Sequence, residues 1–157
     1  AGSAGGRVRS STIVAYLLDT NVLVYRFDSR FPAKQAQATT LLRAAIASGE
    51  GRIAHQSIVE FMAAVTRRPA GGGVSILPLA DARLEAEDLL AQFEVLYPDE
   101  PLVRLALRGM AAYGLSWFDA HLWAYAEHFA LSPLFSEDFQ DGRVYGSVRV
   151  ENPFRAG

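Results

Sequence analysis

One stretch near the start of the chain, residues 13–25, constrains the fold more than any other. It has the sequence IVAYLLDTNVLVY, in which Asp19, Thr20 and Asn21 separate two apolar runs. The first run lacks polar alternation, which is typical of a strand covered on both faces of a parallel sheet. Open α/β sheets bind their ligands at the carboxyl ends of such strands. The stretch therefore predicts a buried parallel strand with Asp19 at a candidate ligand-binding edge.

Length and composition favour one domain. The chain has 157 residues, of which half are hydrophobic and a fifth are charged, and this is enough for a sizeable core. We expect a single domain over 7–157 and exclude residues 1–6, which resemble an expression scar. No apolar run is long enough to span a bilayer, and no signal-peptide pattern is present. We therefore expect no membrane association and take a cytoplasmic location as the default.

The chain contains no cysteine and has a formal net charge of −2. The absence of cysteine excludes disulfides, thiolate zinc sites and cysteine nucleophiles. The negative net charge argues against a surface that binds nucleic acid without specificity. It leaves open a nucleic acid that is bound at an acidic site through cations.

Strand and helix patterns alternate along the rest of the chain. Short strands are predicted over 52–55, 94–97, 133–136 and 146–150. Helices are predicted over 33–48, from Ser57 to about 67, over 79–93, over 100–113 and from Ser116 onward. In the last of these, the apolar positions at helical spacing are Phe118, Leu122, Tyr125 and Phe129. This alternation predicts a three-layer α/β/α domain with a short, mainly parallel sheet of four to five strands.

Acidic residues occur where these strands end and where the following helices begin. They are Asp19, Glu60, Asp119, Glu137, Asp138 and Asp141. In a parallel sheet these positions share one edge, so we expect several carboxylates to face one another. Crowded carboxylates repel one another unless a cation neutralises them. Mg²⁺ suits such a site because it prefers oxygen ligands, and paired ions of this kind can promote phosphodiester cleavage by an activated water.

Each acid also has a purely structural explanation. The segments 57–60 and 116–119 have the spacing of a capping box, in which the acid only closes a helix start. Asp19 can cap the short helix that follows it, and Asp138 is a common turn residue. These alternatives stay open, and they correspond to a catalytically silent module that binds nucleic acid or protein.

The same acids, with their neighbours, resemble the PIN-domain nuclease family and, within it, the VapC-type toxins of toxin–antitoxin pairs. The motifs that carry the resemblance are LDTNVL at 18–23, Glu60, WFDA at 117–120, SED at 136–138 and NPF at 152–154. The match covers nearly all of the chain after residue 6. The opening and closing motifs agree independently, and the acids follow the family's order.

The resemblance implies a compact α/β/α fold and an endoribonuclease that depends on Mg²⁺ or Mn²⁺. It also implies a homodimer that is inhibited by a small cognate antitoxin bound near the active site. The catalytic and metal-binding acids are matched by Asp19, Glu60, Asp119 and Asp138. The supporting polar residues are matched by Thr20, Asn21 and Ser136. A PIN nuclease that acts on DNA or in RNA processing is the alternative within the family.

Two assignments stay open at the level of sequence. Glu137 and Asp141 compete with Asp138 for the position of the fourth acid. Arg67 and Arg68 lie beside a glycine-rich stretch over 70–74 and are candidate RNA contacts. Their structural alternative is a solvated helix end.

Overall fold

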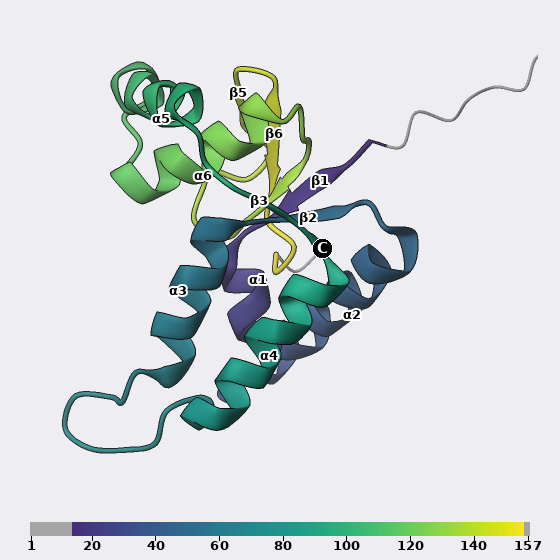
Figure 1. The fold of residues 1–157 in the computed structure, drawn as a ribbon, viewed down its shortest axis with the longest axis vertical. Coiled ribbons are helices and arrows are strands. Elements are labelled where there is room, and N and C mark those ends of the chain that lie inside the picture. The colour runs from purple at the N-terminus through teal and green to yellow at the C-terminus, as the bar shows by residue number, and fades with distance from the viewer. Residues whose placement is uncertain (1–13, 156–157) are drawn as a thin grey trace, which may run out of the picture.

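The computed structural model describes residues 14–155, which form a sheet with helices on both faces (Figure 1). Ile13, predicted to begin the first strand, and the segment 1–6 lie outside the described residues. Within 14–155 the elements are β1 (Tyr16–Leu18), α1 (Thr20–Tyr25), α2 (Pro32–Ser48), β2 (Gly51–Ala54), α3 (His55–Thr66), α4 (Leu79–Gln92), β3 (Glu94–Leu96), α5 (Glu100–Tyr113), α6 (Trp117–His128), β4 (Leu134–Phe135), β5 (Val144–Tyr145) and β6 (Val148–Glu151). Every helix in this part of the chain is too short or too polar to be a transmembrane span.

The sheet has the strand order β3-β2-β1-β4-β6-β5. All neighbouring strands are parallel except β5, which is antiparallel to β6. The predicted α/β/α class with a mainly parallel sheet is therefore confirmed. The sheet has six strands rather than four to five, because the chain before the predicted last strand folds back as a hairpin around Gly146, whose φ of 61° is left-handed.

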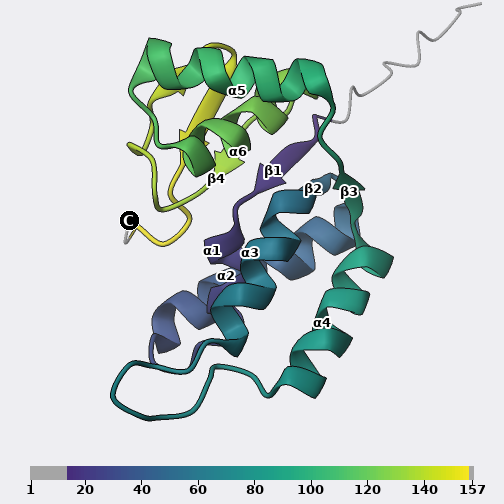
Figure 2. The same cartoon turned by 60° about the vertical axis from the view of Figure 1, so that its left-hand side comes forward.

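Apolar side chains on the two faces of the sheet form two separate clusters. In β1, Leu17 faces the cluster under α5 and α6, and Leu18 faces the cluster under α1 to α4. This follows from the alternation of side chains along a strand. Figure 2 shows the two groups of helices on opposite sides of β1. The prediction that this strand is covered on both faces is confirmed for Leu17 and Leu18, which are both fully buried. It is wrong for Val14, which precedes the strand and is 59% exposed.

The prediction that Ser57 opens a helix is wrong. Helix α3 begins at His55, directly after β2, and its N-cap Ala54 makes no side-chain hydrogen bond. Ser57 is instead fully buried on the same helix face as Phe61, because residues four apart share a face. The capping-box interpretation of Glu60 therefore fails, and Glu60 lies beyond the first turn.

The predicted apolar face of the last helix is wrong at both ends of the helix. Phe118 is 64% exposed and Phe129 is 37% exposed, whereas Leu122 and Tyr125 are buried as predicted. Helix α6 lies between α5 and the sheet, so its middle is buried on several sides and its two ends are not (Figure 2). The predicted cap at Ser116 is confirmed, since its hydroxyl accepts the backbone N–H of Asp119.

Candidate active site

Asp19 lies where the sequence predicts it, at the carboxyl end of β1. It is the N-cap of α1 and accepts the backbone N–H of Thr20. Because Leu18 pairs with Phe135 in β4, Asp19 and Ser136 leave the sheet side by side. The hydroxyl of Ser136 donates a hydrogen bond to Asp19. Its carboxylate thus serves as a helix cap and also faces the neighbouring strand end.

Asn21 connects Asp19 to Asp138. Its amide nitrogen lies 3.3 Å from a carboxylate oxygen of each acid. The backbone N–H of Asp138 donates to the hydroxyl of Ser136 at 3.0 Å, which holds the segment after β4 against the start of α1. Within the described chain, the amide oxygen of Asn21 is buried and has no hydrogen-bond partner. An oxygen in that condition can accept from a water or bind a cation.

Negative charge is poorly compensated here. Burial raises the pKa of Asp19 to about 7, the hydrogen bond from Ser136 opposes this shift, and the charges of Asp138 and Glu60 add to it. The pKa of Asp138 is also raised, first by burial and then by the charge of Asp119. Acids that raise one another's pKa in this way favour the binding of a cation between them.

Glu60 reaches the site from α3 and is held at both oxygens. One oxygen accepts the hydroxyl of Thr20 at 2.9 Å, and the other accepts the side-chain amide of Gln56 at 2.7 Å. The same amide of Gln56 donates to the carbonyl of Phe118 at 3.0 Å, which connects α3 to the start of α6. Gln56 was missed from sequence, although its spacing of four residues from Glu60 indicates a pair on one helix face.

Asp119 lies in the first turn of α6, as predicted. The cap at Ser116 uses only the backbone N–H of Asp119. Its carboxylate lies near enough to Asp138 for its charge to raise the pKa of that acid. A capping role and a role in the acidic site are therefore compatible at this position.

Glu137 and Asp141 have cationic partners of their own. Glu137 forms an ion pair with Lys34 at 2.7 Å, and Asp141 forms one with Arg155 at 2.6 Å. Of these three candidates for the fourth acid, Asp138 is the one that Asn21 bridges to Asp19.

A cleft of about 850 Å³ is lined by three of the predicted acids, Asp19, Glu60 and Asp138. Its walls come from α1, the loop between α1 and α2, α3 and the loop after α3. Besides the acids it is lined by apolar and arginine side chains, among them Val24, Phe27, Ile76, Arg30 and Arg67. Arg68, the second predicted RNA contact, lines a smaller neighbouring pocket of about 360 Å³ instead.

The oxygen atoms of this site fit a hard divalent cation. Across the described residues 14–155, no three acidic, histidine or cysteine side chains form a ready-made metal cluster. Mg²⁺ does not require one, since it is commonly held by one or two carboxylates, several waters and substrate phosphates. Asp19, Asp138 and the unpaired amide oxygen of Asn21 provide donors of that kind.

A family model identifies the class of the protein. The model of the PIN domain matches residues 16–144, and this range contains Asp19, Glu60, Asp119 and Asp138. The chain therefore belongs to the PIN domain family. No curated protein sequence matches it.

Solved structures with this fold include several toxins of toxin–antitoxin pairs. A toxin–antitoxin complex from Klebsiella pneumoniae is 19% identical, with a TM-score of 0.65 and coverage of 88% of this chain and 98% of that chain. VapBC2 from Rickettsia felis, bound to a promoter DNA fragment, is 12% identical, with a TM-score of 0.63 and coverage of 88% and 98%. VapC20 from Mycobacterium tuberculosis, described as a sarcin–ricin loop cleaving toxin, is 15% identical, with a TM-score of 0.57 and coverage of 79% and 90%. The predicted resemblance to VapC-type PIN domains is confirmed, and at these identities it is a likeness of fold.

Proposed function

We propose that this chain is a metal-dependent endoribonuclease and the toxin of a toxin–antitoxin pair. Membership of the PIN domain family and likeness to VapC structures support the proposal. The observation that carries the proposal is the burial of an acid beside a second acid. Asp19 is 4% exposed, and the amide of Asn21 bridges it to Asp138. Burial raises its pKa to about 7, so an ionised Asp19 destabilises the fold unless a cation shares its charge.

The proposed cation is Mg²⁺ or Mn²⁺. When bound, it would supply Lewis-acid chemistry, lowering the pKa of a water for attack on a phosphodiester. Asp19 and Asp138 would hold it, and Ser136 and Asn21 would keep these carboxylates in position. Glu60 would contribute negative charge from a fixed place, because both of its oxygens are hydrogen bonded to side chains of the chain. Asp119 would contribute negative charge from the start of α6.

The proposed substrate is RNA. The cleft beside the acids has a volume within the range of ligand-binding sites. Arg67 lines it and can contact phosphates, which a planar guanidinium binds well. VapC20, with the same fold, is described as a toxin that cleaves the sarcin–ricin loop, and this relative favours RNA over DNA.

The proposed protein partners are a small antitoxin and a second copy of the chain. The relatives from K. pneumoniae and R. felis are complexes of toxin and antitoxin. Large apolar side chains are exposed next to two of the acids, with Val59 at 56% and Phe118 at 64% exposure. Exposed apolar groups of this kind favour protein contacts.

The decisive experiment combines thermal unfolding with an oligonucleotide panel. Millimolar MnCl₂ or MgCl₂ should raise the Tm of the wild type, because a ligand that binds only the folded state stabilises it. Asp19→Asn and Asp119→Ala should lose much of this rise and cleave no RNA while they stay folded. Asp88→Asn, which changes an exposed acid on α4, should behave as the wild type.

Each other outcome has a definite meaning. If no cation raises the Tm and no RNA is cleaved, the acids have a structural role and the chain is a silent binding module. If single-stranded DNA is cleaved as fast as RNA, the proposed substrate is wrong. An Asp119→Ala variant that cleaves normally would contradict the proposed role of that acid.

A further inference from the structure

Lys34 is the only lysine of the chain, and its ammonium contacts the segment that carries Asp138. In the first turn of α2, its Nζ donates to one oxygen of Glu137 at 2.7 Å and to the hydroxyl of Tyr25 at 3.2 Å. The hydroxyl of Tyr25 donates to the other oxygen of Glu137 at 2.6 Å. Both oxygens of Glu137 are therefore held by side chains from α1 and α2.

Three aromatic rings surround the ammonium of Lys34. Its Nζ lies 4.7 Å from the ring centroid of Tyr25, 5.7 Å from that of Phe31 and 5.8 Å from that of Phe154. A cation within about 6 Å of an aromatic face is attracted to it. The ring of Tyr25 packs edge-on against both other rings. Lys34 is thus fixed by four groups from separate parts of the chain.

The side chains of the adjacent acids Glu137 and Asp138 consequently have different partners. Glu137 turns to Lys34, whereas Asp138 shares the amide of Asn21 with Asp19. Without its cationic partner, the Glu137 carboxylate, whose side chain is only 20% exposed, would leave a poorly solvated charge beside the acids. Such a charge would repel them or compete for their cation.

We propose that Lys34 is a positioning residue that holds Glu137 out of the acidic cluster and so keeps Asp138 opposite Asp19. The inference rests on the proposed metal-dependent function and explains which of two neighbouring acids faces the cleft. Lys34 itself does not contact the acids that would hold the cation. It acts through Glu137.

The test is a calorimetric titration of the full chain with Mn²⁺ alone. Lys34→Met should weaken Mn²⁺ binding by about 10-fold, the scale at which partners that orient metal ligands act. Lys34→Arg, which keeps the charge, should retain most of the affinity. In the double variant Lys34→Met/Glu137→Gln the affinity should return toward the wild-type value, since the unpaired charge is gone. Arg104→Met is the matched control, because it breaks an exposed ion pair with Glu100 on α5.

The outcomes separate this inference from the function on which it rests. A wild type that binds no Mn²⁺ overturns the proposed function and this inference with it. A wild type that binds Mn²⁺ and a Lys34→Met variant that binds equally well overturn the inference alone. A double variant that binds Mn²⁺ as weakly as Lys34→Met also overturns the inference, because the lysine would then not act through Glu137.

Two further variants cover the case in which Lys34→Met does not fold. Glu137→Gln removes the charge but keeps the shape of the side chain, since its amide oxygen can still accept from Lys34 and its amide N–H can donate to the hydroxyl of Tyr25. It should bind Mn²⁺ within about twofold of the wild type. Asp138→Asn should bind much more weakly. If Glu137→Gln loses as much affinity as Asp138→Asn, Glu137 is itself a ligand and the inference is wrong.

Discussion

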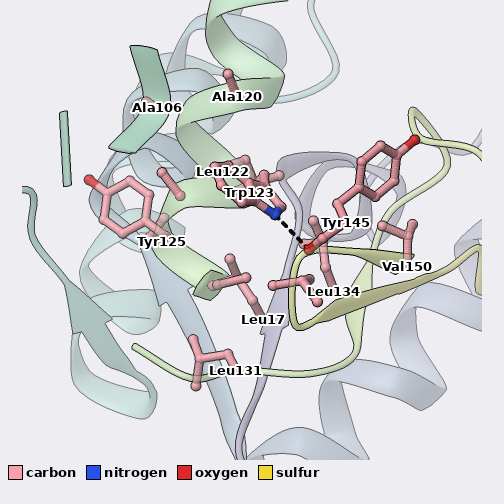
Figure 3. Packing of buried hydrophobic residues seen from close by; sticks show 14 of the residues in the cluster. Leu17, Ala106, Ala120, Leu122, Trp123, Tyr125, Leu131, Leu134, Tyr145 and Val150 are labelled. Carbon is pink, nitrogen blue, oxygen red and sulfur yellow. Dashed lines mark hydrogen bonds between the residues drawn. The ribbon is translucent and has the colours of Figure 1, made fainter. Parts of the chain in front are cut away.

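The face of the sheet under α5 and α6 differs in kind from the face under α1 to α4. On the first, Trp123 is 4% exposed and its indole N–H donates to the carbonyl of Tyr145 at 2.9 Å, as Figure 3 shows. On the second, helices α1 and α3 contribute to a cleft beside the buried charge of Asp19. Both faces therefore contain a buried apolar cluster, but the face under α1 to α4 also borders a cleft beside a buried acid.

The largest effect on stability is expected at the face of the sheet under α5 and α6. Trp123→Ala should lower the free energy of unfolding by about 3–5 kcal/mol, because it removes a buried aromatic side chain and leaves a cavity. Urea denaturation measures the loss. Trp117→Ala is the matched control, since Trp117 on the same helix is 37% exposed and should lose less than half as much. Equal losses in both variants would contradict the assignment of stability to the buried core of this face.

The second effect is a gain in stability, and it concerns the face of the sheet under α1 to α4. Asp19→Asn should raise the metal-free stability by about 2–4 kcal/mol at pH 8, because a folded-state pKa near 7 makes ionised Asp19 unfavourable. Because the folded-state pKa of Asp19 is raised, its contribution to wild-type stability should be fully present below about pH 4 and be lost as pH rises to about 7. The gain from Asp19→Asn should therefore be largest above pH 7 and shrink toward pH 4.

Chemical denaturation at several pH values checks this sign. Asp88→Asn, at an exposed position, should show no such pH-dependent gain. Saturating Mn²⁺ should narrow the gap between the wild type and Asp19→Asn, since the cation favours the ionised acid. If Asp19→Asn is less stable than the wild type at pH 8, the hydrogen bonds of the Asp19 carboxylate stabilise the fold by more than its buried charge destabilises it.

A smaller effect on stability tests how tightly α5 and α6 pack against each other. A Cβ at Gly109 in α5 would lie 2.6 Å from the indole ring of Trp123. Gly109→Ala should cost about 1–3 kcal/mol from overpacking, offset by up to about 1 kcal/mol of helix propensity. Thermal and urea unfolding measure the net loss, which should disappear in a Trp123→Leu background. A gain in stability would show that α5 and α6 can separate at no cost.

The smallest effect concerns a second buried acid beside the cleft. The side chain of Asp28 is 5% exposed and accepts the guanidinium of Arg30 at 2.8 Å. Hydrogen bonds from Arg30 lower its pKa in spite of burial, so its stabilising contribution is present above about pH 4 and is lost as pH falls through the lowered pKa. Arg30→Met should lower the free energy of unfolding only slightly at pH 7, because the Arg30 side chain is largely exposed. The difference from the wild type should vanish in strongly acidic solution.

Much of the acidic edge follows from local sequence. Asp19 comes directly after a buried strand, and Ser116 caps α6 one turn before Asp119, so both positions were predictable from neighbouring residues. Side-chain pairs between distant segments were not predictable. The contact of Gln56 with Phe118 spans 62 residues, and that of Lys34 with Glu137 spans 103. Polar residues of these types look alike in sequence whether they face solvent or a partner.

The start of α3 shows why a correct local rule can fail. Ser57 has the spacing of a helix cap, yet it is fully buried and α3 begins two residues earlier. It lies one turn before Phe61 on the buried face of α3, and its hydroxyl has no hydrogen-bond partner within the described chain. Packing against the rest of the domain therefore outweighs the local preference of serine for a cap.

The sequence by itself determined the alternation of strands and helices, the family, and the set of acids at one edge of the sheet. These depend on hydrophobic periodicity and on residues that are close in the chain. Only the tertiary structure decided that Asp138 faces Asp19 while Glu137 pairs with Lys34. That choice depends on segments about a hundred residues apart, whose side chains meet only after the sheet has formed.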